Sequence, residues 1–428
     1  MASQSNIQTV ALQLEKVRDK LPKLYETDKT FWGAIKQKGE ADTVSSRFMR
    51  IPLQLIPGGI AGGFNPDGGD LGRGSGITWD VAQVTPNWQE FAVELTKLVE
   101  WATRQPQQAI ENAFRYQLKE AMVQFDAYLD MLMQSNGNGI LGTILTTPGA
   151  SPTLAMATPY GASLVFDNNH YNILNAALTA QRLGPNSDGS VTVQAHDAIT
   201  TKTIILSQNA PAATVATDVI VERGVTPGNT VSYFGVPYQV SNATTGTWLN
   251  LNRGTYPYQL QSGRVNANNS ALTPGMVRLA LNQIKLALGS DSVKNSKLGA
   301  YMNVQQEAAW ENAGILISQI IKEGAGGRAN DLDLNFTGDF TMAGVPVKTS
   351  IHWNQTRIDF LALSHWGRAV MKDMDFYDVD GTTIFPLYGA SGGLQAGQIF
   401  YLVIGQQFFT DNPRSQSFID TLSVPSGY

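Results

Sequence analysis

The segment QPQQAIENAFRYQLKEAMVQFDAYLDMLMQSN, residues 105–136, carries the most regular pattern in the chain. Its apolar residues recur every three or four positions, which places them on one stripe of a helix. The stripe consists of Ile110, Phe114, Leu118, Met122, Phe125, Leu129 and Leu132, whereas Glu111, Lys119, Glu120, Gln124 and Asp130 fall mostly on the other side. Pro106 suits a first helical turn, and the run NGNG at 136–139 ends the helix. We expect a helix more than twice the average length of about 11–12 residues, and a long core helix is its simplest interpretation.

The composition limits the kind of protein. A chain of 428 residues is too long for one ordinary core, so we expect two or three domains. A net charge of −5 argues against a dedicated nucleic-acid binder. There is no cysteine, which excludes disulfides and thiolate metal sites. The first residues do not resemble a signal peptide and no apolar run is long enough to span a membrane, so we expect synthesis in the cytoplasm.

The first fifty residues form a basic block. The apolar positions Ile7, Val10, Leu14, Val17, Leu21 and Leu24 step by three and four, as on a short amphipathic helix. Such a helix has too little core of its own and must dock on something. Docking on its own domain and reaching a neighbouring subunit as an arm are both open interpretations.

Residues 51–95 predict a long hairpin with a glycine-rich tip. Two alternating stretches, RFMRIPLQLI (47–56) and ITWDVAQVTPNWQEFAVEL (77–95), flank nine glycines. A loop of this length without a core is usually functional or held by a partner. The glycines do not form a phosphate-binding motif, because no Gly-Lys-Ser/Thr follows and the dinucleotide spacing is absent.

The remainder predicts a β-rich block followed by mixed structure. Short runs rich in Val, Ile, Thr and aromatic residues over 189–265 suit a small barrel or sandwich. A helix over 273–288 follows, capped by Thr273 and closed by Gly289. Asn303 and Gln306 suggest a capping box for a helix that ends at Gly324. Strands over 344–353, 357–364 and 398–409, with a short helix that Ser364 opens, complete an α+β fold.

The search for catalytic and metal-binding motifs finds none. Asp373, Asp375, Asp378 and Asp380 precede Gly381, but their spacing is not that of an EF-hand and the closing Glu is missing. Asp331, Asp333 and Asn335 suit an alternating strand, and His196–Asp197 suits an exposed strand end without a nucleophile motif beside it. No single carboxylate pair stands out for glycoside chemistry. We expect no enzyme activity, no metal and no cofactor.

The order of these pieces resembles that of the major capsid proteins of tailed phages, in the Hong Kong phage-type fold. RIDFLAL (357–363), VDGTTIFPLYGASGG (379–393) and the ending NPRSQSFIDTLSVPSGY look like such shell proteins. Residues 234–259 look like capsid proteins that carry an inserted β-domain. The resemblance implies the following parts: N-terminal arm, 1–50; extended E-loop hairpin, 51–104; spine helix and peripheral (P) domain, 105–185; β-rich insertion domain, 186–268; axial (A) domain with a return to the P-domain, 269–428.

The resemblance also implies a function and partners. Copies would assemble as pentamers and hexamers into an icosahedral virion shell around double-stranded DNA, without sequence-specific binding. Scaffolding and portal proteins would be partners, and decoration proteins are further candidates. Some family members weld subunits through an E-loop lysine, but no lysine lies between Lys38 and Lys97, so we expect a non-covalent shell. An encapsulin-like compartment and a β-rich virion surface-binding protein are the alternatives.

In that setting the hairpin supplies the candidate site. Its large side chains are candidate contacts with a neighbouring subunit, together with one arginine: Trp79, Trp88, Phe91, Phe64 and Arg73. Its glycines are candidate hinges between immature and expanded shells: Gly58, Gly59, Gly62, Gly63, Gly68, Gly69, Gly72, Gly74 and Gly76.

Overall fold

The computed structural model describes most of the chain. The described residues are 27–38, 41–44, 47–63, 66–67, 73–96, 113–198, 200–291, 293, 297–311, 341–389 and 392–425. The expected helix over residues 7–24, the helix end at Gly324 and the strand at 331–335 lie outside them. None of the described helices is long and apolar enough to cross a membrane.

The predicted long helix is α4, Ala113–Leu132. Residues 105–112 of the prediction lie outside the described part. Phe125, Leu129 and Leu132 are fully buried, as the stripe predicts. Met122 was predicted on the same buried stripe, but 42% of its surface is exposed. On a 3.6-residue period it lies at the edge of the stripe that faces the core.

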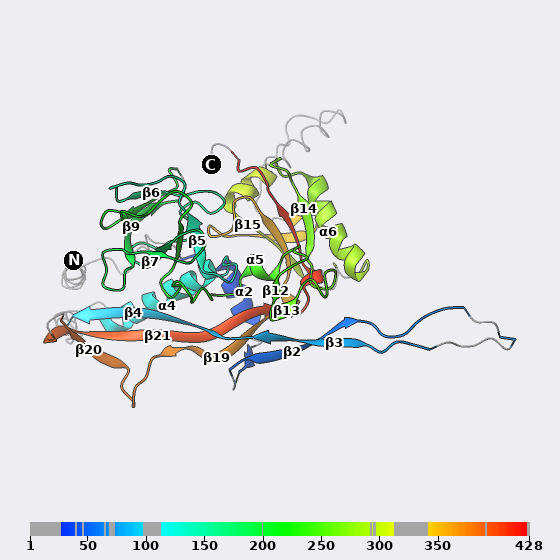
Figure 1. Ribbon diagram of the computed structural model, residues 1–428, viewed down its shortest axis with the longest axis horizontal. Coiled ribbons are helices and arrows are strands. Elements are labelled where there is room, and N and C mark those ends of the chain that lie inside the picture. The colour runs from blue at the N-terminus through cyan, green and yellow to red at the C-terminus, as the bar shows by residue number, and fades with distance from the viewer. Residues whose placement is uncertain are drawn as a thin grey trace, which may run out of the picture.

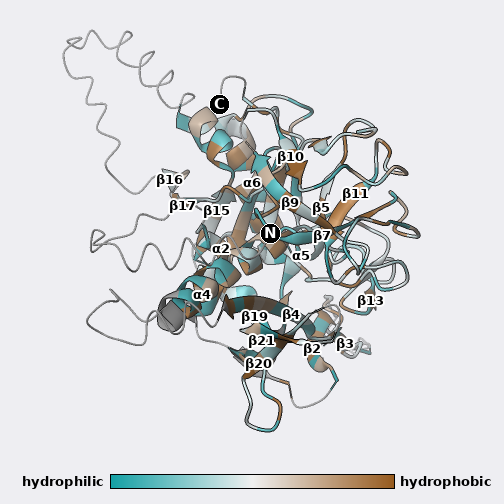
Figure 2. Cartoon of the chain, turned by 90° about the vertical axis from the view of Figure 1, so that its left-hand side faces the viewer, coloured by the Kyte–Doolittle hydropathy of each residue, from teal (hydrophilic) through white to brown (hydrophobic). Residues whose placement is uncertain are grey.

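A five-stranded sheet lies beneath α4 (Figures 1 and 2). Its central strand is β21, Leu394–Thr410, which pairs with β4, Asn87–Thr96, along one edge. The other edge of β21 is shared by β19 and β20, and β1 pairs with β19. The bounds are β1 Ala41–Thr43, β19 Trp366–Phe376 and β20 Ile384–Tyr388. The expected strand at 398–409 is thus the larger part of β21.

The predicted hairpin is present as β2, Met49–Ile56, and β3, Thr78–Val84. The two strands pair with each other in antiparallel register. They extend away from the body along the long axis of the molecule (Figure 1).

Seven strands between residues 140 and 222 form a closed barrel. They are β5 Ile140–Thr143, β6 Thr153–Ala155, β7 His170–Leu174, β8 Gln181–Arg182, β9 Val191–Asp197, β10 Thr203–Leu206 and β11 Val219–Glu222. Six pair in the order β5-β11-β7-β9-β10-β6, and β8 joins β7 at the side. A bridge between Ile144 and Met156, with Leu145 N–H donating to Ala155 O at 2.8 Å, joins the two ends. Buried aliphatic side chains fill the interior, among them Leu154, Val193 and Ile220.

This barrel changes the expected division of the chain. A boundary at residue 186 runs through the sheet, between β8 and β9, and so does not separate two units. The β-rich block was predicted to extend to residue 265, but the barrel ends at Glu222. Residues 223–262 are mostly turns, bends and irregular chain. They hold only the one-turn helix α5, Val236–Gln239, and the short strands β12, Thr247–Trp248, and β13, Leu251–Asn252.

The last unit is a six-stranded sheet covered by α6, Pro274–Leu288. The strand order is β14-β22-β18-β15-β17-β16, with bounds β14 Gly263–Asn266, β15 Leu298–Met302, β16 Thr341–Met342, β17 Val345–Thr349, β18 Ile358–Ala362 and β22 Ser417–Asp420. Thr273 caps α6 and Gly289 follows it with φ of 98°, as predicted. Two short 3-10 helices are η1, Leu363–His365, and η2, Pro413–Ser415. η1 lies where a helix opened by Ser364 was expected.

The expected capping box at Asn303 is not formed. The side chain of Asn303 does accept from the N–H of Gln305, and residues 304–311 are helical. The Gln306 amide instead donates to the carbonyls of Gln355 and Ser423. Gln306 therefore ties the helix to the neighbouring chain segments and does not cap its start.

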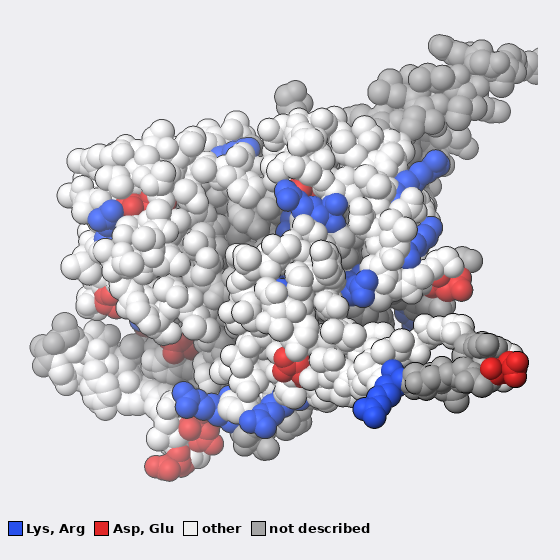
Figure 3. Space-filling model, turned by 45° about the vertical axis from the view of Figure 1, so that its right-hand side comes forward, with Lys and Arg blue, Asp and Glu red and all other residues white. Residues whose placement is uncertain are grey.

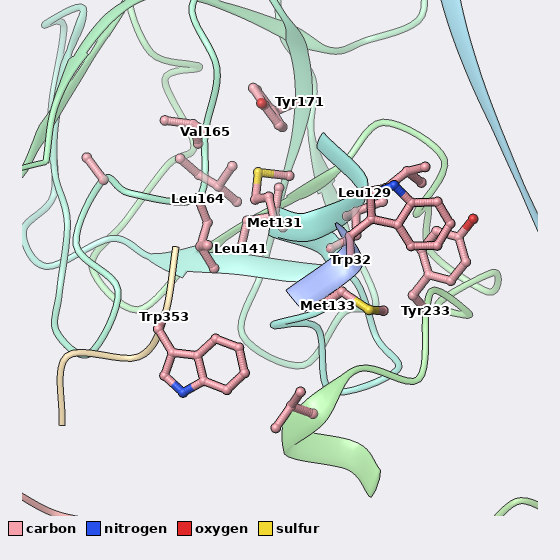
Figure 4. Close-up of a cluster of buried hydrophobic side chains, with 14 of the residues drawn as sticks. Trp32, Leu129, Met131, Met133, Leu141, Leu164, Val165, Tyr171, Tyr233 and Trp353 are labelled. Atoms are coloured by element: carbon pink, nitrogen blue, oxygen red, sulfur yellow. The ribbon is translucent and has the colours of Figure 1, made fainter. Parts of the chain in front are cut away.

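A helix that the sequence did not predict, α2 at Thr30–Lys38, joins the three units. Phe31 is fully buried and meets Tyr301, Trp353 and Trp366 edge-on, with ring centroids 5.1–5.7 Å apart. Figure 4 shows Trp32 beside Leu129 of α4 and Tyr233. These partners come from α4, from the segment 223–262 and from both other sheets, and the core cluster that contains α2 also contains barrel side chains such as Leu154 and Val193.

Candidate assembly interface

The hairpin has two chemically different faces. Antiparallel pairing places Ile51 opposite Ala82 on one face, and Pro52 opposite Val81 on the other. The first face packs on a buried cluster that contains Trp248 and Leu260. The N–H of Gln83 also donates to the carbonyl of Leu249 at 2.8 Å. The root of the hairpin is therefore fixed to its own subunit through one face only.

The second face is mostly exposed and carries apolar side chains together with Arg50, Gln54 and Gln83. Trp79 lies on the same side of β3 as Val81, and 59% of its surface is exposed. Further exposed apolar side chains on the hairpin are Ile56, Ile60 and Ile77. An isolated two-stranded hairpin is marginally stable in water, and contiguous exposed apolar surface marks an interaction site. This face is the strongest candidate for contact with another molecule.

Two glycines shape the distal part of the hairpin. Gly58 lies so close to the opposite strand that an added Cβ would come within 2.8 Å of the backbone nitrogen of Ile77. Gly59 has φ of 97°, a conformation that favours glycine, and its N–H donates to the carbonyl of Ser75 at 2.8 Å. Gly62, Gly63, Gly74 and Gly76 meet no such constraint. Gly68, Gly69 and Gly72 lie outside the described residues.

The other candidate contacts differ in their surroundings. Arg73 is exposed near the tip, and Phe64 lies outside the described residues. Trp88 is 53% exposed, and its ring lies over Gly405 of the paired strand, where an added Cβ would come within 2.8 Å of it. Phe91 faces inward, with its ring 5.7 Å from that of Phe125 on α4. Phe91 therefore packs within its own subunit, which corrects its expected role as an outward anchor.

A buried polar contact fixes the strand that follows the hairpin. The side chain of Gln89 on β4 donates to the carboxylate of Glu222 on the barrel at 2.9 Å. Burial raises the pKa of Glu222 to about 7, which the hydrogen bond from Gln89 partly opposes. Nearby, the amide side chain of Gln407 on β21 accepts from the N–H of Phe234 and donates to the carbonyl of Ser232. The first contact joins the barrel to β4, and the contacts of Gln407 join the segment 223–262 to β21.

The acidic turn after β19 is held by its own hydrogen bonds. The carboxylate of Asp378 accepts from the N–H of Gly381 at 2.7 Å, and Asp380 has φ of 53°. His196 pairs with Asp167 and His365 with Asp411 at the surface. Within the described ranges, no group of three or more His, Asp or Glu residues is placed to hold a metal ion.

A search of solved structures finds a phage capsid with a similar fold. The capsid of cyanophage A-1(L) aligns over 98% of this chain and 99% of its own, with a TM-score of 0.57 and 13% identity. The chain has a tailed-phage capsid fold. Weaker similarity extends to the capsid of a native GTA particle (TM-score 0.46, 9% identity, 96% and 95% covered) and to the SrpI encapsulin of Synechococcus elongatus PCC 7942 (TM-score 0.44, 10% identity, 98% and 96% covered). No protein-family model and no curated protein matches the sequence.

The exposed apolar side chains of the hairpin are explained if this face contacts another molecule. In an isolated subunit the exposed apolar side chains of the hairpin stay in contact with water, and they carry a risk of aggregation. A neighbouring molecule that covered this face would remove that exposure. The hairpin outer face is therefore our candidate assembly interface.

Proposed function

We propose that this chain is a major capsid protein, which assembles in many copies into an icosahedral shell around the double-stranded DNA of a tailed phage. The observation that carries the proposal is the projecting hairpin with Trp79 on its exposed face, in a chain with a capsid fold. The role is structural and requires no catalysis, metal or cofactor. Assembly takes place in the host cytoplasm, and the product is the virion capsid.

The parts of the subunit take the following roles in this proposal. The hairpin β2–β3 is the extended loop that lies over a neighbouring subunit, and α4 is the spine helix. The five-stranded sheet belongs to the peripheral domain, and the sheet with α6 is the axial domain. The barrel at 140–222 is the inserted β-domain. Contacts between copies are heterologous and close into pentamers and hexamers. Scaffolding, portal and decoration proteins are further partners.

The first test compares the wild-type chain with Trp79→Ser and with the matched control Tyr258→Ser. Tyr258 is also strongly exposed but lies outside the hairpin. Negative-stain microscopy after expression should show shells for wild type and control, and free subunits or capsomers for Trp79→Ser. Assembly of Trp79→Ser at wild-type yield would refute the assigned role of the hairpin.

The contents of the shells separate the two shell functions. Particles from infected cells should contain duplex DNA, whereas co-purifying protein cargo would identify an encapsulin-like compartment. A β-rich virion surface-binding protein would instead bind its ligand as a subunit that does not assemble into shells.

A further inference from the structure

The outer face of α6 carries two exposed leucines. The inner face of the helix buries four side chains against the six-stranded sheet: Val277, Ala280, Leu281 and Ile284. Leu279 and Leu286 point away from that sheet, with 48% and 82% of their surface exposed. Seven residues separate them, so they lie on the same face of the helix, roughly 10 Å apart at a rise of about 1.5 Å per residue. We call these two leucines the α6 stripe.

Positive charge borders the α6 stripe on one side. Arg278 and Lys285 each precede one of the leucines by one position, so they lie about 100° around the helix from the stripe. Long basic side chains beside an apolar row keep their charged ends in water when the row is covered. The sequence of α6 contains no Asp or Glu. A surface that covers the stripe must therefore be apolar and must bring no further positive charge.

The barrel presents a surface of that kind. The loop 144–152, between β5 and β6, and the loop 207–217, between β10 and β11, contain no charged residue. Two backbone hydrogen bonds of 2.9 and 3.0 Å hold the loops side by side, from Thr217 N–H to Ile144 O and from Ala210 N–H to Ser151 O. Their large apolar side chains that are exposed are Leu145, at 58%, and Val215, at 43%. We call the surface of these two loops the barrel patch.

Charged residues of the barrel make contacts of their own away from the patch. They form the following pairs: Arg182 with Asp218, His196 with Asp167, Lys202 with Gln355 and Glu222 with Gln89. The part of the barrel that is visible at the upper left of Figure 3 shows few charged side chains. The core of a protein interface is depleted of charge, and each copy of this chain carries a net charge of −5. An uncharged surface is therefore the one that another copy approaches at the least electrostatic cost.

The α6 stripe and the barrel patch lie on opposite sides of the subunit. In Figure 1 α6 lies on the right of the body, on the side toward which the hairpin projects, and the barrel lies on the left. A neighbouring copy that lies along the hairpin therefore also lies beside α6. In a head-to-tail ring, that neighbour presents its opposite side, which is the side of the barrel. The two surfaces are thus placed to meet between copies and not within one copy.

We infer that the α6 stripe of one subunit binds the barrel patch of the next subunit around a ring. Leu279 and Leu286 pack on the two loops that carry Leu145 and Val215, and the basic residues of α6 stay at the rim of the contact. The partner is a second copy of this chain. The inference rests on the proposed function, because the contact exists only if copies form rings, and it adds an interface distinct from the hairpin.

One added charge tests whether the stripe is covered. Leu286→Glu should leave the urea midpoint of the free subunit unchanged, because the leucine is exposed there. The same variant should lower the yield of shells about tenfold or more, since every contact would then bury a carboxylate without a partner. The matched control is Tyr258→Glu, at a residue that is 75% exposed and outside both surfaces, and it should assemble like wild type. Wild-type yield from Leu286→Glu would overturn the inference.

The lack of cysteine in the chain allows a second, geometric test. Two double variants, Leu286→Cys with Val215→Cys and Leu286→Cys with Leu145→Cys, are oxidised as assembled shells and run on a denaturing, non-reducing gel. A head-to-tail contact links one chain to the next, so at least one double variant should give a ladder of covalent multimers that ends at five or six subunits. Each single variant should give only monomer.

The outcomes of this test separate the contact from the shell function. Normal shells in which neither double variant forms multimers would refute the contact and leave the shell function standing. Dimers from Leu286→Cys alone would also refute it, because they would show that two α6 faces meet each other. A wild-type chain that never assembles would refute the proposed function and this contact together.

Discussion

Asp130 offers a sharp prediction, because its buried carboxylate holds the start of α2. It accepts from the N–H groups of Phe31 at 2.9 Å and Trp32 at 2.6 Å. These are first-turn amides, which have no partner within their own helix. One turn earlier on α4, the Asp126 carboxylate accepts from the indole N–H of Trp32 at 2.8 Å. Two carboxylates of α4 therefore fix α2 in the core.

Burial raises the pKa of Asp130 to about 7, and nearby Asp28 adds to the increase, while the N–H groups of Trp32 and Phe31 and the Ser350 side chain oppose it. The folded-state pKa thus lies above the unfolded value. The folded chain then holds an extra proton between about pH 4 and 7, and the stability from this proton is lost as the pH rises through 7. A displacement of about 3 pKa units corresponds to about 4 kcal/mol.

Two substitutions separate the charge from the hydrogen bonds. Asp130→Asn keeps an acceptor oxygen but cannot ionise, so its stability relative to wild type should rise by about 4 kcal/mol between pH 4 and 8. Asp130→Ala leaves two buried N–H groups without acceptors and should be less stable than Asp130→Asn by about 2–5 kcal/mol. The assay is urea unfolding of the unassembled subunit, followed by tryptophan fluorescence at pH 4 and pH 8. Parallel pH profiles for wild type and Asp130→Asn, or an Ala variant as stable as the Asn variant, would refute this reasoning.

Three further predictions follow from the described contacts. Glu222→Gln should raise the melting temperature at pH 8 and leave it unchanged near pH 4, because the raised pKa of about 7 makes the ionised form costly in the fold; an equal shift at both values would contradict this. Phe31→Ala should destabilise the subunit by about 3–5 kcal/mol in urea unfolding, since its buried ring packs between Tyr301 of one sheet and Trp366 of the other. A loss below about 1 kcal/mol would show that this junction does not depend on it. Gly58→Ala should reduce shell yield while the melting temperature stays unchanged, because the added Cβ would push β2 and β3 apart only in the projecting part; wild-type yield would exclude a strict need for that geometry.

Local patterns sufficed to predict α4, α6 and the hairpin. Thr273, Pro274 and Gly289 mark the ends of α6 in the sequence as they do in the structure. The alternation of β2 and β3 directly gives their two faces. In each case the information lies within a short window, because a 3.6- or 2-residue period decides which side chains face the core.

The barrel could not be delimited in the same way. β7 and β11 are buried along most or all of their length, so they do not alternate. Closure depends on the pairing of Ile144 with Met156 and on strands far apart in sequence. For a related reason, nothing in the sequence indicated that Asp130 would be buried and would hold the start of α2. On the helix it falls with polar residues, and only the arrival of α2 from nearly a hundred residues away buries it.

Strand parity could have improved the predicted site. Trp88 and Phe91 are three positions apart on β4, so their side chains must point to opposite faces of the sheet. Both were predicted as outward anchors, although only one of them could be. The structure turns Phe91 toward α4 and leaves Trp88 exposed. Which of the two faced outward required knowledge of where α4 packs.

The central claim is that copies of this chain form a closed shell. Its most direct test is electron cryomicroscopy of the protein expressed alone and together with candidate scaffolding genes. The account predicts hollow icosahedral particles in which the hairpin of each subunit lies on its neighbour through the face that carries Trp79. A monodisperse monomer under all of these conditions would contradict it.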